Sequence, residues 1–314
     1  MKFVIIEPLG VEQNLLLSMA KDALGDSVEL VYHDTRTTDT AELIARGKDA
    51  DIIAVSNLPL NADVINGCEK LKFLSVAFTG VDHIALDACM AKGVTVSNCA
   101  GYSTAAVADL VFGMLVTFYR NVLPCDERCR AGGTKDGLIG FELEGKTFGV
   151  VGTGAIGLRV ANIAKAFGCK VLAYSRTEKA VEGITYTDLD TLLKESDIVS
   201  LHTPLTPDTK GLINADKLAL MKKSAVLINT ARGPVVDSKA LADALNNGVI
   251  AGACLDVFDI EPPLDPNDAL MKAKNTLVTP HIAFATKEAL IKRAVIVFDN
   301  VIAFQKGAPI NVIV

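Results

Sequence analysis

The chain has 314 residues, of which half are apolar and 22% are charged. This length suits one large or two medium domains with a sizeable core. The net charge of −6, from 31 basic and 37 acidic residues, argues against a nucleic-acid-binding surface, which needs clustered Lys and Arg. The first residues lack a signal-peptide pattern and no apolar stretch approaches 18 residues, so neither secretion nor a membrane span is expected.

The cysteines indicate the compartment. There are seven of them, an odd number, scattered along the chain, which is typical of a reduced, cytoplasmic protein. Cys125 and Cys129 lie four residues apart, but no matching Cys or His pair is nearby, so no metal site is expected.

The first hundred residues alternate short apolar runs with helical patterns. We predict strands at 2–6, 28–32, 51–55, 73–76 and 94–97, and helices at 11–24, 39–46, 61–66 and 84–91. This alternation indicates βαβ units and a parallel sheet. A long helix is predicted from Thr104 to Phe118 or beyond, because Gly101-Tyr-Ser103 offers an N-cap. A looser, glycine-containing stretch, 124–146, follows it.

A second series of βα units is predicted from residue 147 onwards. Its strands are expected at 147–151, 170–174, 197–201, 225–229, 250–254 and 276–279, and its helices at 155–167, 188–194, 214–221 and 238–246. Six strands fit a full dinucleotide-binding domain. A final helix, roughly 286–305, lies beyond the sixth strand and could return to the first unit. Two such units would place a cleft between them, a common place for a site and a hinge.

The most specific motif is a glycine fingerprint between the first strand and first helix of this second series. It reads Gly152-x-Gly154-x-x-Gly157. Gly152 permits the tight turn, Gly154 lets the backbone approach a pyrophosphate, and Gly157 lets the helix pack on the strand. The helix N-terminus then offers free N–H groups to the phosphates. A dinucleotide site is therefore predicted, although glycines also occur at such turns for packing alone.

The end of the next strand bears on the choice of cofactor. An Asp or Glu there would bind a ribose 2′-OH, but this chain has Ser175, Arg176 and Thr177. These residues supply charge and donors for a 2′-phosphate, which favours NADP(H) over NAD(H). NAD(H) stays possible, because Arg176 could stack on the adenine and Glu178 lies close by.

Three ionisable residues follow three predicted strands of the second series: Arg232, Glu261 and His281. Ligands of open α/β sheets bind beyond the carboxyl ends of the strands, so these residues belong to one edge. They suit the reduction of a 2-oxo acid. His281 can protonate the carbonyl oxygen, Glu261 can orient its ring, and Arg232 can hold the carboxylate as a fork. Asp256 can accept a bond from the nicotinamide amide. Each of these residues also occurs in purely structural roles.

Taken together, these motifs resemble the D-isomer-specific 2-hydroxyacid dehydrogenases. The similarity runs from the fingerprint through Thr203-Pro204, Asn229-Thr-Ala-Arg-Gly233 and Asp256-Val-Phe to Glu261-Pro-Pro263 and Thr279-Pro-His-Ile282. The resemblance implies two doubly wound parallel-sheet domains, with a Rossmann cofactor domain inserted in a flavodoxin-like substrate domain. We place the substrate domain at 1–99 plus 286–314 and the cofactor domain at 100–285. A homodimer formed through the long helix and the 124–146 segment is also implied.

The resemblance assigns roles residue by residue. It implies that Arg232, Glu261 and His281 are the catalytic triad. It places the substrate carboxylate on Thr79 and Gly80, in the Ala77-to-His83 loop, and on Arg232. The implied cofactor contacts are Thr104, Gly152, Gly154, Ala155, Ile156, Gly157, Ser175, Arg176, Thr177, Thr203, Pro204, Ala231, Asp256 and His281.

Within the family, a glyoxylate/hydroxypyruvate reductase is the best match. Formate dehydrogenases carry Gln in place of Glu261, phosphite dehydrogenases carry Lys in place of Thr79, and phosphoglycerate dehydrogenases offer an Arg in the loop that here reads Val55-Ser56-Asn57. Many of these enzymes carry Trp where this chain has Phe284. This difference alters the wall of the pocket, so branched or aromatic 2-oxo acids are alternative substrates. The remaining alternatives are a dehydrogenase for 3-phosphoglycerate and, more remotely, an NAD(H)-sensing co-regulator.

Overall fold

The computed structural model describes residues 1–261 and 264–314 and divides the chain into two compact units. The first comprises Met1–Ser103 and Ala285–Val314, and the second comprises Thr104–Phe284. The second unit is thus an insertion in the first, as the resemblance implies. The domain bounds inferred from the sequence lie four residues and one residue away from these divisions. The first division falls where the long helix begins, at Thr104.

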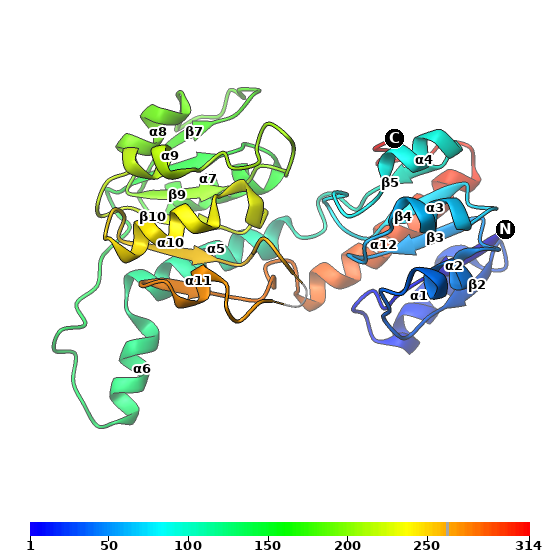
Figure 1. Cartoon of the computed structure of the whole chain (residues 1–314), viewed down its shortest axis with the longest axis horizontal. Coiled ribbons are helices and arrows are strands. Elements are labelled where there is room, and N and C mark those ends of the chain that lie inside the picture. The colour runs from blue at the N-terminus through cyan, green and yellow to red at the C-terminus, as the bar shows by residue number, and fades with distance from the viewer. Residues whose placement is uncertain (262–263) are drawn as a thin grey trace. The chain divides into compact units, whose positions relative to one another are not determined.

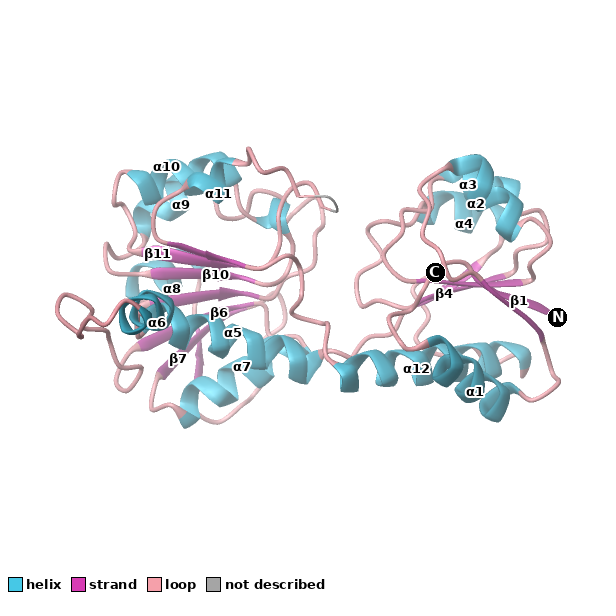
Figure 2. Cartoon of the chain, turned by 90° about the horizontal axis from the view of Figure 1, so that it is seen from below, coloured by secondary structure: helices cyan, strands magenta, loops and turns pink. Residues whose placement is uncertain are grey.

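The first unit is built on a five-stranded parallel sheet of order β2-β1-β3-β4-β5. This is the flavodoxin-like order. Its strands are β1 (Lys2–Ile5), β2 (Glu29–Tyr32), β3 (Ile52–Val55), β4 (Phe73–Val76) and β5 (Thr95–Ser97), and its helices are α1 (Gln13–Leu24), α2 (Thr40–Gly47), α3 (Ala62–Gly67), α4 (Leu86–Lys92) and α12 (Lys287–Gln305). Helices α1 and α12 cover one face of the sheet, and α2, α3 and α4 cover the other (Figure 2).

The second unit is built on a seven-stranded parallel sheet of order β12-β11-β10-β9-β6-β7-β8 (Figure 1). Its strands are β6 (Thr147–Val151), β7 (Lys170–Tyr174), β8 (Ile184–Tyr186), β9 (Ile198–Leu201), β10 (Val226–Asn229), β11 (Gly252–Leu255) and β12 (Thr276–Val278). Its helices are α5 (Thr104–Tyr119), α6 (Val122–Arg130), α7 (Ala155–Ala166), α8 (Leu189–Glu195), α9 (Ala215–Leu220), α10 (Ser238–Asn246) and α11 (Ala269–Lys272), with a 3₁₀ turn at Gly233–Val235. The order outward from β6 is that of a Rossmann sheet.

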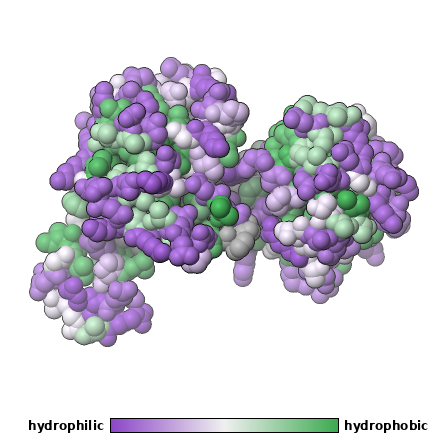
Figure 3. Space-filling view, viewed as in Figure 1, coloured by the Kyte–Doolittle hydropathy of each residue, from purple (hydrophilic) through white to green (hydrophobic). Residues whose placement is uncertain are grey.

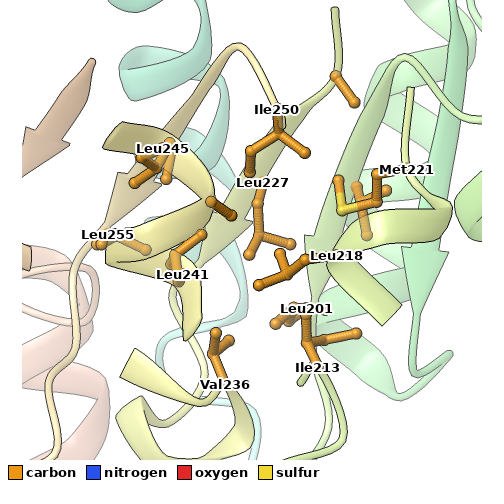
Figure 4. Packing of buried hydrophobic residues seen from close by; sticks show 14 of the residues in the cluster. Leu201, Ile213, Leu218, Met221, Leu227, Val236, Leu241, Leu245, Ile250 and Leu255 are labelled. Carbon is orange, nitrogen blue, oxygen red and sulfur yellow. The ribbon is translucent and has the colours of Figure 1, made fainter. Parts of the chain in front are cut away.

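The central strands of both sheets are buried because helices cover both faces of each sheet. All four residues of β3, β4, β9, β10 and β11 are buried, as expected for parallel strands with helices on both sides. On one face of the second sheet, side chains from α9, α10 and the strands form a continuous apolar core that includes Leu201, Leu218, Leu227, Leu241 and Leu255 (Figure 4).

Several predicted helices begin one residue too early, and the physical reason is helix capping. The predicted helices start at Asp39, Asn61, Asp188 and Asn214, but each of these residues is an N-cap. The side-chain oxygen of each accepts a hydrogen bond from a backbone N–H in the first turn. Each of these residues therefore lies just before the first helical residue and stabilises the start of the helix.

The prediction missed three elements. Helix α6 overlaps the start of the stretch 124–146 that we expected to be loose, and strand β8 makes the sheet seven-stranded rather than six-stranded. Helix α6 has no buried residue and β8 is an edge strand of three residues, so neither has the apolar periodicity on which the prediction relied. The third missed element, α11, is only four residues long.

No single helix in the described part of the chain is both long and apolar enough to cross a membrane. Helices α5 and α6 pass such a test only as a pair, bent by 57° at the break between them.

Candidate active site

The ionisable residues singled out in the sequence lie at the carboxyl ends of three neighbouring strands. Arg232 follows β10, Glu261 follows β11 and His281 follows β12. These strands are adjacent and parallel, so their carboxyl ends form one edge of the sheet. The fold therefore brings residues 49 positions apart in the chain to the same edge, as predicted from the strand pattern.

His281 and Glu261 form a hydrogen-bonded pair. The imidazole Nδ1 lies 2.7 Å from Oε1 of Glu261, and the two side chains are only 21% and 16% exposed. A carboxylate on Nδ1 sets the tautomer and the orientation of the imidazole ring. The ring of Phe284 packs edge-on against the imidazole, with 5.5 Å between centroids. The ring is thus held from two sides.

The backbone of His281 is in the left-handed region, with φ of +53°. Such a conformation is uncommon for a residue with a side chain and needs support from its surroundings. Asp256 supplies that support. The N–H of His281 donates to the Asp256 carbonyl oxygen at 2.7 Å, and the Asp256 carboxylate accepts from Ile282 N, Ala283 N and the Thr279 hydroxyl at 2.6–2.8 Å.

Asp256 is therefore the residue that shapes the loop carrying His281. Its side chain is completely buried, and burial raises the pKa of its carboxyl above the ordinary value, against the opposing effect of its three hydrogen bonds. The expected role of Asp256 was a direct bond to the nicotinamide amide. The structure gives its carboxylate internal partners instead, and the cofactor contact stays a prediction.

Asn229 shapes the loop that carries Arg232, a role that sequence reasoning did not assign. Its Oδ1 accepts from Ala231 N at 3.0 Å, and its Nδ2 donates to the Arg232 carbonyl oxygen at 2.8 Å. The Asn229 side chain is buried at the end of β10. A polar amide at the end of an otherwise apolar strand was the available signal. Gly233 is required next in the chain, because a Cβ there would lie 2.1 Å from the Phe258 carbonyl carbon.

The glycine fingerprint has the geometry of a phosphate-binding turn. Gly152 has φ of +97°, and a Cβ on Gly157 would lie 1.9 Å from the Gly152 carbonyl oxygen. Both positions therefore require glycine. Gly154 differs, because a Cβ there would meet nothing within 4 Å among the residues that the structure describes. It is the N-cap residue of α7 and has no side-chain cap, so the N–H groups of the first turn, including those of Ala155 and Ile156, stay available for an anion.

The loop after β9 lies against this turn. A Cβ on Gly152 would lie 2.7 Å from the His202 carbonyl oxygen and 3.1 Å from Cγ2 of Thr203. The buried Thr203 hydroxyl has no hydrogen-bond partner in the described part of the chain, which fits a residue that meets a ligand. Desolvation lowers the pKa of His202 to about 3, so its ring is neutral near pH 7, and its Nε2 lies 2.9 Å from the Ser200 hydroxyl. Pro204 follows and is exposed.

Ser175, Arg176 and Thr177 directly follow β7, the strand beside β6. Arg176 and Thr177 are exposed and Ser175 is partly so. Two further residues, which sequence reasoning missed, contact the fingerprint itself. Lys179 Nζ donates to the Thr153 carbonyl oxygen, and the Tyr186 hydroxyl donates to Thr153 Oγ1, both at 3.0 Å.

Three other predicted residues belong to helix α5 and to the loop after β4. Thr104 is the first residue of α5, which packs against α7. Thr79 and Gly80 belong to the first unit, in the loop after β4, where Asn98 Nδ2 donates to the Thr79 carbonyl oxygen at 2.7 Å. Their contacts with a substrate carboxylate remain a prediction.

Comparison with known proteins identifies the class. Residues 112–283 match the family described as D-isomer specific 2-hydroxyacid dehydrogenase, NAD binding domain. The chain belongs to this family, which makes it an oxidoreductase that uses a nicotinamide cofactor. The resemblance drawn from the motifs is thus confirmed.

The relatives cover nearly the whole chain. A hydroxypyruvate reductase from Blautia hydrogenotrophica is 34% identical over 100% of this chain and 99% of its own length. A glyoxylate reductase from Thermococcus litoralis is 40% identical over 88% of this chain and 87% of its own length. Among solved structures, an acyclic imino acid reductase in complex with NADPH and D-Arg has a TM-score of 0.90 at 33% identity, with 100% of both chains covered.

The two kinds of glycine predict different effects of alanine. Gly157→Ala forces a Cβ onto the Gly152 carbonyl, so we expect a loss of about 1–3 kcal/mol in the free energy of unfolding. A Cβ on Gly154 would meet nothing within 4 Å among the described residues, so Gly154→Ala should match the wild type in urea unfolding without ligand, while its affinity for the dinucleotide falls. Urea unfolding measures the stability of each variant, and fluorescence titration with NADPH and NADH measures its cofactor affinity. Unchanged cofactor affinity in Gly154→Ala would contradict a pyrophosphate at this turn.

Proposed function

We propose that this protein reduces a small, unphosphorylated 2-oxo acid to the D-2-hydroxy acid, with glyoxylate and hydroxypyruvate as the preferred substrates. The observation that carries the proposal is the 2.7 Å pair of His281 and Glu261 on the sheet edge that also carries Arg232. The names of the two relatives described above support the choice of substrate.

The residues of the site have distinct tasks in this reaction. His281 holds a proton on Nε2 for the carbonyl oxygen of the substrate, because Nδ1 is engaged by Glu261. The Glu261 carboxylate lies on Nδ1 of His281 and keeps the ring in place during the transfer. Arg232 binds the substrate carboxylate as a planar fork and polarises the adjacent carbonyl.

The residues present fit a dinucleotide. Gly152, Gly154 and Gly157 shape the turn, and the first N–H groups of α7 would hold the pyrophosphate. The Thr203 hydroxyl has no hydrogen-bond partner among the described residues and could bond to the cofactor. Pro204 and Ala231 would line the adenosine and nicotinamide parts. The bound reduced nicotinamide would supply the hydride.

The cofactor we propose is NADP(H). The exposed Arg176, with Ser175 and Thr177 beside it, offers a cation and hydroxyl donors to a 2′-phosphate and no carboxylate to a 2′-OH. The related imino acid reductase holds NADPH in its solved structure, which supports the same choice.

We further propose that the protein is a homodimer formed through the α6 region of the second unit. Helix α6 stands away from the sheet (Figure 1), and hydrophobic patches are visible on the surface of the second unit in the space-filling view (Figure 3). In the stretch 122–141, Leu123 is 52%, Phe141 64% and Ile139 86% exposed. A cavity of about 420 Å³ lies beside it, lined by Phe118, Leu123, Phe141 and their neighbours. Exposed apolar surface of this kind is typical of a subunit interface.

The location we propose is the cytoplasm. All seven cysteines lie among the described residues and are free thiols, and five are buried. Burial raises the pKa of Cys99 and Cys254 to about 12, so these thiols stay protonated and unreactive.

A steady-state screen of 2-oxo acids with both reduced cofactors tests the proposal. We expect a higher kcat/KM for hydroxypyruvate than for pyruvate, and a lower KM for NADPH than for NADH. The reverse substrate order would overturn the substrate assignment, and equal KM values for the two cofactors would overturn the cofactor preference. A turnover below roughly 0.01 per second on every acid, against a typical median near 10, would favour a cofactor-sensing role instead.

Removing the proton donor tests the mechanism. His281→Ala should lower kcat by about 10²–10⁴-fold with little change in cofactor affinity. Arg232→Lys should also lose most activity, because a point charge does not replace the guanidinium fork. His33→Ala, a partly buried histidine of the first unit, is the matched control and should keep wild-type kcat. A normal rate in either site variant would remove that residue from the mechanism.

The interface proposal predicts a particle of twice 33.2 kDa in sedimentation equilibrium. Phe141→Asp should shift it toward the monomer, because a charge would replace an apolar contact. Met90→Asp changes a comparably exposed apolar residue of the first unit and should leave the mass unchanged. A wild-type protein that sediments as a monomer would contradict the proposal.

A further inference from the structure

Ser56, the residue that directly follows β3, is held at each of its polar atoms by a different part of the first unit. Its N–H donates to Glu7 Oε1 at 2.8 Å, its carbonyl oxygen accepts from His83 Nε2 at 2.9 Å, and its hydroxyl accepts from Arg293 Nη1 at 3.0 Å. Glu7 follows β1, His83 follows β4, and Arg293 belongs to α12. Three elements therefore converge on one serine.

Glu7 is the central member of this group. Its Oε1 accepts a second bond, from Leu58 N at 3.0 Å, so one carboxylate oxygen holds both ends of the segment 56–58. The side chain is 1% exposed, and Arg36 Nε approaches its other oxygen to 3.6 Å. Burial raises the pKa of the Glu7 carboxyl, whereas the two backbone bonds and the charges of Arg36 and Arg293 act against that rise.

Arg293 completes the group from the far side of Ser56. Its side chain is buried, a second nitrogen donates to the Leu9 carbonyl oxygen, and its guanidinium lies 5.6 Å from the ring centroid of Tyr102. The loop after β1 and the loop after β3 are thus tied to the same cation.

The position of this group points to a ligand rather than to stability alone. It lies at the carboxyl edge of a parallel sheet, where ligands of such sheets bind. His83 ends the loop Ala77–His83, which contains Thr79 and Gly80. Ser56 therefore links Glu7 to the loop on which the substrate carboxylate is expected. Buried charges contribute little net stability compared with apolar residues of similar size, so their presence here needs another explanation.

The opposite edge of the same sheet offers a comparison. There Asp51 also joins β1 to β3: its Oδ2 accepts from Lys2 N at 2.9 Å, and its Oδ1 accepts from Lys72 Nζ at 2.7 Å. Asp51 is 20% exposed, and those bonds lower the pKa of its carboxyl. It performs the structural task of bridging strands without a buried ion group and away from the carboxyl edge.

We infer that Glu7 is a positioning residue for substrate: it fixes the segment 56–58 and, through the Ser56–His83 bond, the loop that receives the substrate carboxylate. This inference rests on the proposed function, because it concerns the binding of the same 2-oxo acid. Glu7 acts through the backbone it holds and takes no part in proton or hydride transfer.

The test compares Glu7→Ala with Asp51→Ala in the full-length protein. A displacement of roughly 1 Å in a substrate-holding loop can cost about 100-fold in efficiency, so we expect Glu7→Ala to lower kcat/KM by about 10- to 100-fold. The loss should be mainly in KM for the 2-oxo acid, with NADPH affinity by fluorescence titration unchanged. Asp51→Ala should lower the unfolding temperature but keep the wild-type KM.

Two conservative variants separate positioning from folding. Glu7→Gln keeps an oxygen that can accept both N–H groups, so it should restore much of the KM. Glu7→Asp keeps the charge but is one methylene too short, so it should show the raised KM even if Glu7→Ala does not fold. A folded Glu7→Asp or Glu7→Ala variant with wild-type KM would overturn the inference, as would an equal rise in Asp51→Ala. If the wild-type protein turned over none of the 2-oxo acids, the proposed function would be overturned, and this inference with it.

Discussion

The site depends on one buried carboxylate. Asp256 lies where β11 ends, has no exposure to water, and collects three hydrogen bonds from the chain that follows β12. Together with the bond from the His281 N–H to the Asp256 carbonyl oxygen, these bonds hold the left-handed backbone of His281 against its conformational cost. Because Asp256 sets this backbone, it also sets the direction in which the imidazole meets Glu261.

The same principle recurs along the carboxyl edges of both sheets. Strands β1, β10 and β11 are largely buried, and a polar side chain at or just beyond the end of each one bonds to the backbone of a loop at the same edge. Asn229, the last residue of β10, bonds to the loop that follows it, whereas Asp256 beyond β11 bonds to the loop after β12 and Glu7 beyond β1 bonds to the loop after β3. A buried polar group is costly unless its bonds are satisfied, and that cost makes each of these loops adopt a single conformation.

The sequence predicted the parts of the site that depend on local chemistry. The glycine spacing predicted the turn, and the structure shows why Gly152 and Gly157 admit no side chain. The polar residues beyond apolar strands predicted the edge shared by Arg232, Glu261 and His281. Helix α6 was missed because it buries none of its residues, and Lys179 was missed because its contact with Thr153 joins positions 26 residues apart.

The sequence by itself determined most of the strands and helices, the dinucleotide turn and the family, since each depends on periodicity or on residue types at short spacing. Only the tertiary structure decided which side chains share a partner. Glu7 and Ser56 are 49 residues apart, and Arg293 is 237 residues from Ser56, yet they meet because parallel strands and a returning helix bring their ends together. Such contacts arise from the packing of whole elements, and no local pattern in the chain encodes them.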